Sequence, residues 1–429
     1  MTQSEARQRP EFLRKIYKGH PELTRLSSIT TFVGKGILGG RILNLALFGK
    51  PRMGIHKSRH FHPFTTSTGT RAPMLALVVS LVALPAFSQT PADALAFEGN
   101  SQWAQAAEAW RMVVKQNPHD AGAFASLGLD LARQGKYAEA VPAYKQALAL
   151  NPKLPGIELN LGLAEFKQGH FASAIAPLRA ASAADPTSVQ ARALLGMSYY
   201  GANRFAEAVK VLKPISDQDP GNSELSEVLA RSCLKSKDYP CAQAQFRKIL
   251  ERSPDSVAAH VLLAEAYDGL HQTDQAIAEY EAAEKISPRE PSLHFELGYV
   301  YWEAHRYEEA KREFETELAN DPASPQALAY LGDIELERNN LDEAASLLEK
   351  ATAHSRDLRI AALDLGTVRM QQKQYPAAVK ALQRAIELDP DSSDAHYRLG
   401  RVYQAMGNKA AAEKEFAKTR ELHQKLQKQ

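Results

Sequence analysis

Cysteine is nearly absent from this sequence, and so are the patterns typical of catalytic sites. Only two cysteines occur in 429 residues, and no Cys-x-x-Cys pair is present. His-Glu-x-x-His, Gly-x-Ser-x-Gly and the Gly-Lys-Ser/Thr ending of a phosphate loop are also missing. These absences argue against a zinc protease, a hydrolase with a nucleophile elbow and a phosphate-loop enzyme. We therefore expect a protein that is not an enzyme and needs no cofactor.

Long apolar runs are equally scarce. The stretch Met74–Phe87 holds fourteen mostly apolar residues, which is too few to cross a bilayer, since a spanning helix needs about 20. It has instead the length of the apolar core of a secretory signal, with basic residues upstream and the small residues Ala86 and Ser88 at the cleavage pattern. We expect export to the periplasm or the medium, with cleavage after Ser88; the alternative is membrane association through an uncleaved amino-terminal segment.

Residues 1–73 differ in composition from the rest of the chain. They carry thirteen Lys or Arg against three Asp or Glu, whereas the remainder carries 39 basic and 47 acidic residues. They show no sustained helical or strand period, so we expect a disordered basic extension, and we expect its histidines, His56, His60 and His62, to bind no metal. A signal at residues 74–88 then has two explanations. Either the translation start is assigned too early and Met53 is the true first residue, or the extension is associated with the membrane; we favour the first.

What the chain has in abundance is one 34-residue unit, repeated nine times without insertion over residues 121–426. The seventh place of the unit is always leucine and the twentieth always alanine, while the eighth is glycine or alanine and a proline closes most copies. Small residues at these places let two helix backbones approach closely, and spacings of three, four and seven give each helix an apolar stripe. A fixed period of this length is the signature of a solenoid.

The pattern resembles the tetratricopeptide repeat, a helix-turn-helix unit with small residues at its eighth and twentieth places. The resemblance implies an all-α fold, a right-handed superhelical solenoid of stacked helix-turn-helix repeats. Residues 89–120 fit a degenerate first unit in the same phase, with Trp103 and Trp110 at aromatic places. Residues 427–429 would end the last helix.

In that family, segments of partner proteins lie on a concave wall formed by the first helix of each unit. The resemblance therefore implies a protein-binding scaffold. Any one wall residue could instead pack neighbouring units, but three aromatic residues of the unit 291–324 share one helical face, and for these we favour partner binding. The partner-binding candidates are Phe166, Met197, Tyr200, Arg231, Glu265, Phe295, Tyr299 and Trp302.

We predict a bacterial-type exported scaffold that grips an extended or helical segment of another protein and binds neither nucleic acid nor metal directly. The alternative is a subunit of a cell-envelope machine, for secretion or polysaccharide export, that docks to a membrane complex through a partner. The recurrence of His260, His294 and His396 at the fourth place of their units indicates a packing role for these side chains.

The two cysteines, Cys233 and Cys241, fall on opposite arms of one predicted hairpin, near its turn. In an oxidising compartment they could form a disulfide. The alternative is that Cys233 is a small buried apolar residue and Cys241 has no role.

Overall fold

The described part of the chain is built from α-helices. The computed structural model describes residues 90–219 and 221–427, and every regular element within them is helical. These residues divide into two compact units, an amino-terminal unit of residues 90–204 and a carboxy-terminal unit of residues 205–427. The helices are α2 (Pro91–Gly99), α3 (Trp103–Gln116), α4 (Ala121–Arg133), α5 (Tyr137–Leu150), α6 (Ile157–Lys167), α7 (Phe171–Ala184), α8 (Val189–Gly201), α9 (Phe205–Gln218), α10 (Ser223–Lys235), α11 (Tyr239–Arg252), α12 (Val257–Gly269), α13 (Thr273–Ile286), α14 (Leu293–Glu303), α15 (Tyr307–Asn320), α16 (Pro325–Glu337), α17 (Leu341–His354), α18 (Arg359–Gln371), α19 (Tyr375–Leu388), α20 (Ser393–Ala405) and α21 (Lys409–Gln427).

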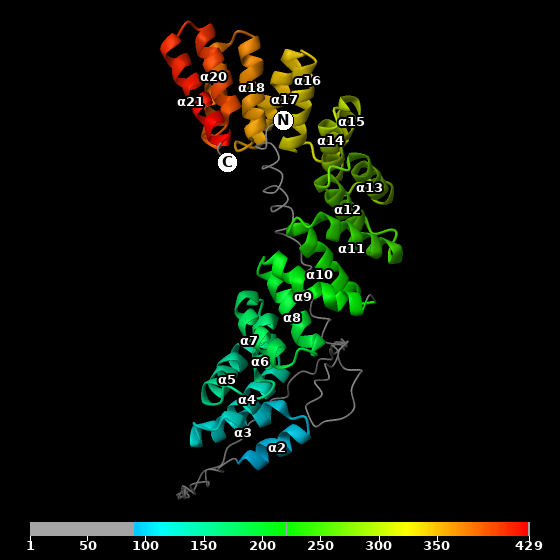
Figure 1. Ribbon diagram of the computed structural model, residues 1–429, viewed down its shortest axis with the longest axis vertical. Helices are drawn as coiled ribbons and strands as arrows, with labels where there is room; N and C mark the ends of the chain where they lie inside the picture. Colours follow the sequence, from blue (N-terminus) through cyan, green and yellow to red (C-terminus); the bar gives the residue numbers. More distant parts are fainter. Residues whose placement is uncertain (1–89, 220, 428–429) are drawn as a thin grey trace, which may run out of the picture. The chain divides into compact units, whose positions relative to one another are not determined.

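The helix boundaries follow the 34-residue period. Helices α4, α16 and α20 begin at residues 121, 325 and 393, the first place of their repeats. Within each of the two units, consecutive helices lie side by side and pack in pairs, which can be followed in Figure 1 from the helix labels. The predicted all-α fold of stacked helix-turn-helix repeats is confirmed.

Polar side chains fix where the first helix of a repeat begins. In six repeats the residue before the first place is Asp, Ser or Asn, and its side chain accepts a hydrogen bond from the backbone amide three residues later; each such cap contributes about 1 kcal/mol. The shorter helices α6 and α14 lack this cap and begin two residues late, after Gly156 (φ 78°) and Ser292 (φ 64°), which have left-handed backbone. The capping residues are Asp120, Ser188, Asn222, Ser256, Ser324 and Ser392.

The turn inside each repeat contains one residue with left-handed backbone, always at the fifteenth place. Glycine adopts this conformation without a steric penalty, but the other residues do so at a cost. Three of the nine residues are glycines, and the structure has the same bend in the other six, so the bend belongs to the repeat. The residues are Gly135, Gly169, Asn203, Lys237, His271, His305, Asn339, Lys373 and Gly407.

A close contact explains the small residue at the eighth place. A Cβ atom added to Gly366 would lie 2.5 Å from Cγ of Leu382, and one added to Gly332 would lie 2.6 Å from Cγ of Leu348. In both repeats the contacted leucine occupies the twenty-fourth place and is fully buried. Where the eighth place is glycine, the side chain at the twenty-fourth place therefore packs directly against the backbone of the first helix.

Neighbouring repeats are joined by a recurring polar contact, which we call the tether. It runs from the twenty-fifth place of one repeat to the eleventh place of the next, a separation of twenty residues. Lys145 Nζ donates to Glu165 Oε1 at 3.0 Å, and Tyr301 Oη donates to Glu281 Oε1 at 2.8 Å. The chemistry varies while the position is kept, which indicates that the geometry of the stack sets the contact. The other tethers join Arg179 to Tyr199, Arg247 to Tyr267, Arg369 to Glu349 and Gln383 to Tyr403.

The eleventh place of one repeat is occupied by Cys233 of α10, which bonds to Cys241 of α11 instead of forming a tether. The two sulfur atoms lie 2.03 Å apart and the Cα atoms 5.6 Å apart, within the Cα range that disulfides span. Both side chains are buried, at 0% and 8% exposure. Formation of this bond in the isolated protein stays a prediction.

Reduction of this disulfide should lower the free energy of unfolding of the carboxy-terminal unit by about 2–3 kcal/mol, because the bond closes a short loop. Chemical denaturation with and without reductant measures the difference. The Cys241→Ala variant is the control, since its stability should not respond to reductant. Two free thiols in peptide mass analysis of protein isolated without reductant would contradict the prediction.

The predicted signal at residues 74–88 and the basic extension 1–73 lie outside the described residues. Among the helices of residues 90–427 that the structure describes, none combines the length and the apolar character that a membrane-crossing segment requires.

Candidate functional site

The predicted partner-binding residues are divided between the two units. Phe166, Met197 and Tyr200 belong to α6 and α8 of the amino-terminal unit, and the other five belong to the carboxy-terminal unit. Phe166 and Met197 are only 6% and 2% exposed, and the ring of Phe166 packs edge-on against Phe171 at 5.4 Å between centroids. Tyr200 is half-buried. The side chains of Phe166 and Met197 thus belong to the core of their unit and offer a partner little contact area.

The two charged candidates are paired within the carboxy-terminal unit. Arg231 Nη2 lies 2.9 Å from Glu227 Oε1 on the same helix, and Glu265 Oε1 lies 3.8 Å from Lys235 Nζ. Both candidates are half-buried. Pairs of this kind contribute little to stability, and a partner that uses either charge must compete with the existing pair.

Phe295, Tyr299 and Trp302 of α14 form one cluster with Tyr330 of α16. The ring centroids of the three lie 5.9, 5.4 and 5.0 Å from that of Tyr330. We call these four residues the aromatic cluster. Phe295 and Tyr299 are each 7% exposed, so most of their surface is buried between two neighbouring repeats. For these two residues the structure agrees with the alternative interpretation, in which a wall residue packs neighbouring repeats.

Of the three cluster residues on α14, Trp302 is the one that stays partly exposed. Its Nε1 donates to Asp333 Oδ2 at 2.7 Å, and the hydroxyl of Tyr299 donates to Glu303 Oε1 at 2.7 Å. The indole ring is therefore held by a hydrogen bond on one side and by Tyr330 on the other. A partly exposed tryptophan that is already fixed in place loses little conformational freedom when a partner binds.

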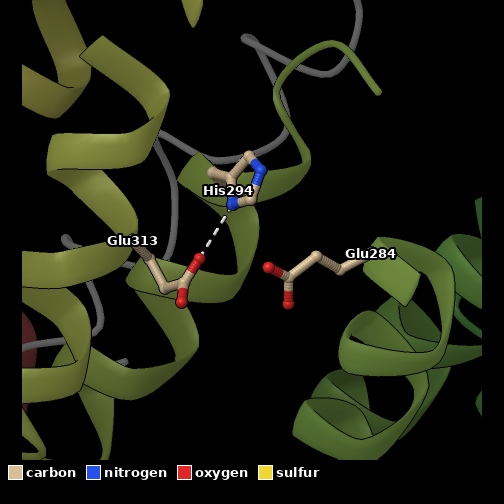
Figure 2. Close-up of side chains that lie close together, drawn as sticks. All are labelled: Glu284, His294 and Glu313. Atoms are coloured by element: carbon tan, nitrogen blue, oxygen red, sulfur yellow. Dashed lines mark hydrogen bonds and ion pairs between the residues drawn. The ribbon is translucent and has the colours of Figure 1, made fainter. Parts of the chain in front are cut away.

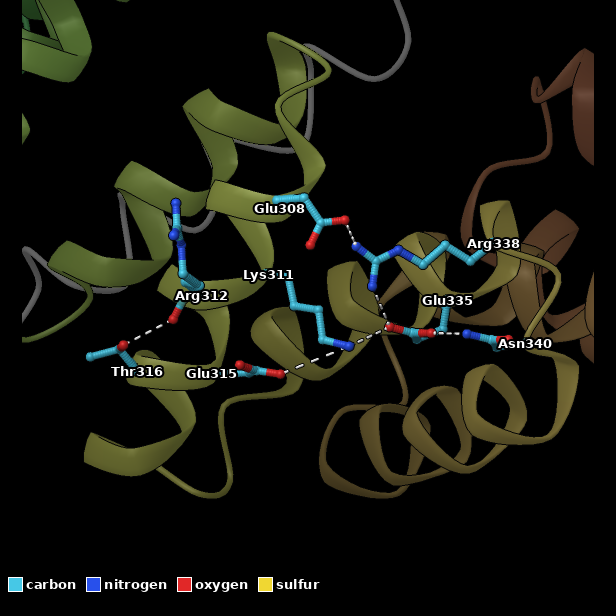
Figure 3. A network of polar contacts seen from close by, with 8 residues as sticks. All are labelled: Glu308, Lys311, Arg312, Glu315, Thr316, Glu335, Arg338 and Asn340. Atoms are coloured by element: carbon cyan, nitrogen blue, oxygen red, sulfur yellow. Dashed lines mark hydrogen bonds and ion pairs between the residues drawn. The ribbon is translucent and has the colours of Figure 1, made fainter.

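A buried carboxylate, Glu335 of α16, is the centre of an ion network that joins α16 to α15 (Figure 3). Glu335 is 1% exposed, and it accepts hydrogen bonds from Lys311 Nζ at 2.7 Å, Arg338 Nη1 at 3.3 Å and Asn340 Nδ2 at 2.6 Å. Arg338 also binds Glu308 of α15. Burial raises the pKa of Glu335, but the hydrogen bonds from Asn340 and Lys311 outweigh burial and hold that pKa below its ordinary value.

Two other carboxylates are buried without such a set of donors. Asp130 of α4 is 0% exposed and neither of its carboxylate oxygens accepts a hydrogen bond from a described residue, although Arg133 Nη1 lies 3.5 Å from Oδ1. Burial raises its pKa from 3.8 to about 7, and the charge of Glu98 adds to this. Burial likewise raises the pKa of Asp364, whose Oδ1 lies 3.4 Å from Arg398 Nη1. A perturbed pKa often marks a functional site, but Asp130 is enclosed and no substrate can reach it.

The recurring histidines at the fourth place make a recurring contact. In each case Nδ1 faces a glutamate nineteen residues later and Nε2 faces the backbone carbonyl of a proline six residues earlier. For His294 these partners are Glu313 Oε2 at 2.8 Å and the carbonyl oxygen of Pro288 at 2.8 Å. Burial lowers the pKa of His294, but the contacts with Glu313 and Pro288 raise it above its ordinary value overall. The same pairs are His260 with Glu279 and His396 with Glu415.

A second carboxylate, Glu284 of α13, stands beside His294 and Glu313 (Figure 2). One ligand atom of each of the three residues lies within 4.8 Å of the others. Burial raises the pKa of Glu313, the contact with His294 lowers it, and the charge of Glu284 raises it further. This cluster is absent from the sequence predictions because its residues come from three helices and two repeats. Its signal in the sequence is a glutamate at the twenty-eighth place followed by a histidine at the next fourth place.

Family models of the tetratricopeptide repeat match most of the chain. A model described as "TPR repeat" matches residues 128–169 and 366–407, and models described as "Tetratricopeptide repeat" match residues 165–232, 234–295, 295–357 and 394–425. No curated protein sequence matches the chain.

Several solved structures are similar to this chain. Yeast Tom70 is 14% identical, with 77% of this chain and 91% of that chain covered and a TM-score of 0.37. The APC/C hetero-tetramer Cut9-Hcn1 is 14% identical, with coverages of 77% and 80% and a TM-score of 0.44. YrrB, described as a TPR protein with an unusual peptide-binding site, is 21% identical, with coverages of 41% and 91% and a TM-score of 0.36. The family matches and the unbroken 34-residue period of paired helices show that this chain belongs to the tetratricopeptide-repeat family.

Proposed function

We propose that the chain is an exported scaffold that binds segments of partner proteins and carries out no chemistry of its own. Tetratricopeptide repeats are protein-interaction modules, and membership in the family supports the general role. The observation that carries the specific proposal is Trp302, a tryptophan left partly exposed on a first helix and fixed by Asp333 and Tyr330. Tryptophan held in this way is the residue type most often found as a binding hot spot.

The groups around Trp302 indicate the chemistry of the partner segment. Glu303 follows it on α14 and Asp333 accepts its indole hydrogen. Burial raises the pKa of Tyr307, the first residue of α15, and the charges of Glu337 and Asp333 raise it further. An indole face bordered by carboxylates suits a segment that places an apolar side chain next to Lys or Arg. We therefore propose a basic and apolar segment as the occupant.

Replacing Trp302 with alanine should weaken binding of the partner segment by about 2 kcal/mol or more, which is a loss of about thirtyfold in affinity. The partner is first captured from intact envelopes with the wild-type protein, and its affinity for both proteins is then measured by titration. The free energy of unfolding is measured on the same variant, because loss of a buried tryptophan would cost roughly 3–5 kcal/mol of stability.

Trp103→Ala is the matched control, since Trp103 is also partly exposed but lies on α3 in the amino-terminal unit, stacked with Arg133 at 4.1 Å. Its substitution should leave the affinity unchanged. If Trp302→Ala unfolds the repeats and the remaining folded protein binds with unchanged affinity, the ring is core and the proposed site is wrong. Capture of one soluble partner would favour the scaffold, whereas capture of membrane complexes would favour a subunit of an envelope machine.

Export makes a separate prediction. The mature protein should begin near Gln89, as the apolar core Met74–Phe87 and the small residues Ala86 and Ser88 indicate. Amino-terminal sequencing of the periplasmic or secreted form measures this. A main species that retains residues before Met74 would contradict cleavage and favour association with the membrane through the uncleaved segment.

A further inference from the structure

We propose that Glu284, His294 and Glu313 form a binding site for one divalent transition-metal ion, best matched by Zn²⁺, that links α13 to α14 and α15. The three side chains come from two neighbouring repeats and converge on one point between their helices (Figure 2). One ligand atom from each lies within 4.8 Å of the other two.

The ring of His294 is already oriented as a metal-binding histidine is. It is 2% exposed, and Nε2 donates its hydrogen to the carbonyl oxygen of Pro288 at 2.8 Å. Nδ1 and Glu313 Oε2 share a hydrogen bond across 2.8 Å in the metal-free chain, and release of that proton on metal binding would leave the Nδ1 lone pair free for the ion. Histidines that bind metals generally donate their second ring hydrogen to a carbonyl or carboxylate in this way, which fixes the tautomer and the ring orientation.

Comparison among the repeats shows that Glu284 is the unusual member. His260 and His396 have the same carboxylate and the same proline carbonyl as partners. The place that corresponds to Glu284 is occupied by leucine, Leu250, in the repeat before that of His260. It is occupied by isoleucine, Ile386, in the repeat before that of His396. The pair of histidine and glutamate therefore recurs as a packing contact between helices. Of the three histidine sites, only that of His294 has a second carboxylate. Two carboxylates held close together repel each other, and a divalent cation between them removes that repulsion.

The set of ligand atoms selects the class of metal. One imidazole and two carboxylates suit Zn²⁺, whereas Ca²⁺ and Mg²⁺ prefer oxygen atoms only. Zinc bonds of about 2.0–2.2 Å place tetrahedral ligands roughly 3.3 Å apart. The present separations of up to 4.8 Å are wider than this, so binding requires the carboxylates to move toward the ion. Three protein ligands leave the fourth position of the ion to water.

Glu284→Leu tests the proposal, because leucine occupies the same place at residue 250 and the variant should fold. The full chain is stripped with a chelator and dialysed against Zn²⁺, and zinc per chain is measured together with the melting temperature. We expect the wild type to hold one more tightly bound zinc per chain than Glu284→Leu, with affinity at the site reduced about tenfold or more in the variant. Zinc should raise the melting temperature of the wild type and leave that of the variant nearly unchanged.

Glu279→Gln is the matched control, since it removes the carboxylate partner of His260, where no third ligand stands. It should bind as much zinc as the wild type. Equal zinc content and equal melting shifts in the wild type and Glu284→Leu would overturn the site. A melting shift with Mg²⁺ or Ca²⁺ as large as that with Zn²⁺ would overturn the assigned class of metal.

Discussion

Asp130→Asn should remove a pH dependence from the stability of the amino-terminal unit. The pKa of Asp130 in the folded chain is about 7 because of burial and the charge of Glu98, against 3.8 for an ordinary aspartate. Between these two values the folded state holds a proton that the unfolded state has lost, so the free energy of unfolding falls as the pH rises from about 4 to 7. Below this window both states are protonated, and above it both are ionised.

The expected size of this effect is up to about 4 kcal/mol, since each tenfold change in proton affinity corresponds to about 1.4 kcal/mol. Urea unfolding at pH 4.5 and pH 8, with hydrogen exchange of the α4 amides as a local readout, measures it. The free energy of unfolding of Asp130→Asn, relative to that of the wild type, should be much higher at pH 8 than at pH 4.5. Glu108→Gln removes a carboxylate from an exposed site on α3 and serves as control; an equal change in both variants would show that burial of Asp130 has no such consequence.

Lys311→Met should destabilise the carboxy-terminal unit by about 3 kcal/mol, because it leaves Glu335 buried with fewer compensating charges. Methionine keeps much of the volume of the lysine stem, so the change is mainly one of charge. Arg338 and Asn340 still bind Glu335 in the variant, which places the loss at the low end of what removal of one buried partner costs. Denaturant unfolding of wild type and variant gives the difference.

The double variant Lys311→Met/Glu335→Leu should recover most of this loss, because an apolar pair of similar volume avoids burial of an unpaired charge. Arg312→Met is the control on the same helix. Arg312 is exposed, and its contact in Figure 3 is a backbone carbonyl that accepts from Thr316 at 2.9 Å, so its substitution should change stability by less than about 0.5 kcal/mol. A double variant as unstable as the single one would contradict the account of Glu335 as a buried charge.

The fold could be predicted because the same local sequence pattern recurs in nine consecutive repeats. Leucine at the seventh place and alanine at the twentieth fix the apolar stripe of both helices, and this stripe predicts the pairing without knowledge of any distant contact. The exceptions are local too. Helices α6 and α14 start late because Pro155 and Pro291 replace the usual first residue and no cap precedes them.

The candidate site could be predicted only in part, because the period fixes which helix face a residue occupies and not how deeply its neighbours cover it. Phe295, Tyr299 and Trp302 do share a face, yet Tyr330 of the following repeat covers the first two and leaves the third partly exposed. The cluster around His294 was missed for a related reason. Its third member, Glu284, belongs to the preceding repeat, and reading one repeat at a time separates ligands that the stacking of repeats brings together.

The tether has a consequence for how a chain of this kind can change in length during evolution. Wherever it forms, the tether joins the twenty-fifth place to the eleventh place of the next repeat, so a duplication or loss of one whole copy leaves every other junction as it was. At one junction a loss would even improve the match. Glu315 now stands opposite Glu335, two groups of like charge, and excision of residues 325–358 would bring Glu315 opposite Arg369. Loss of residues 291–324 would instead bring Glu281 opposite Glu335, so the charges at these two places decide which copies can be lost without setting like charges against each other.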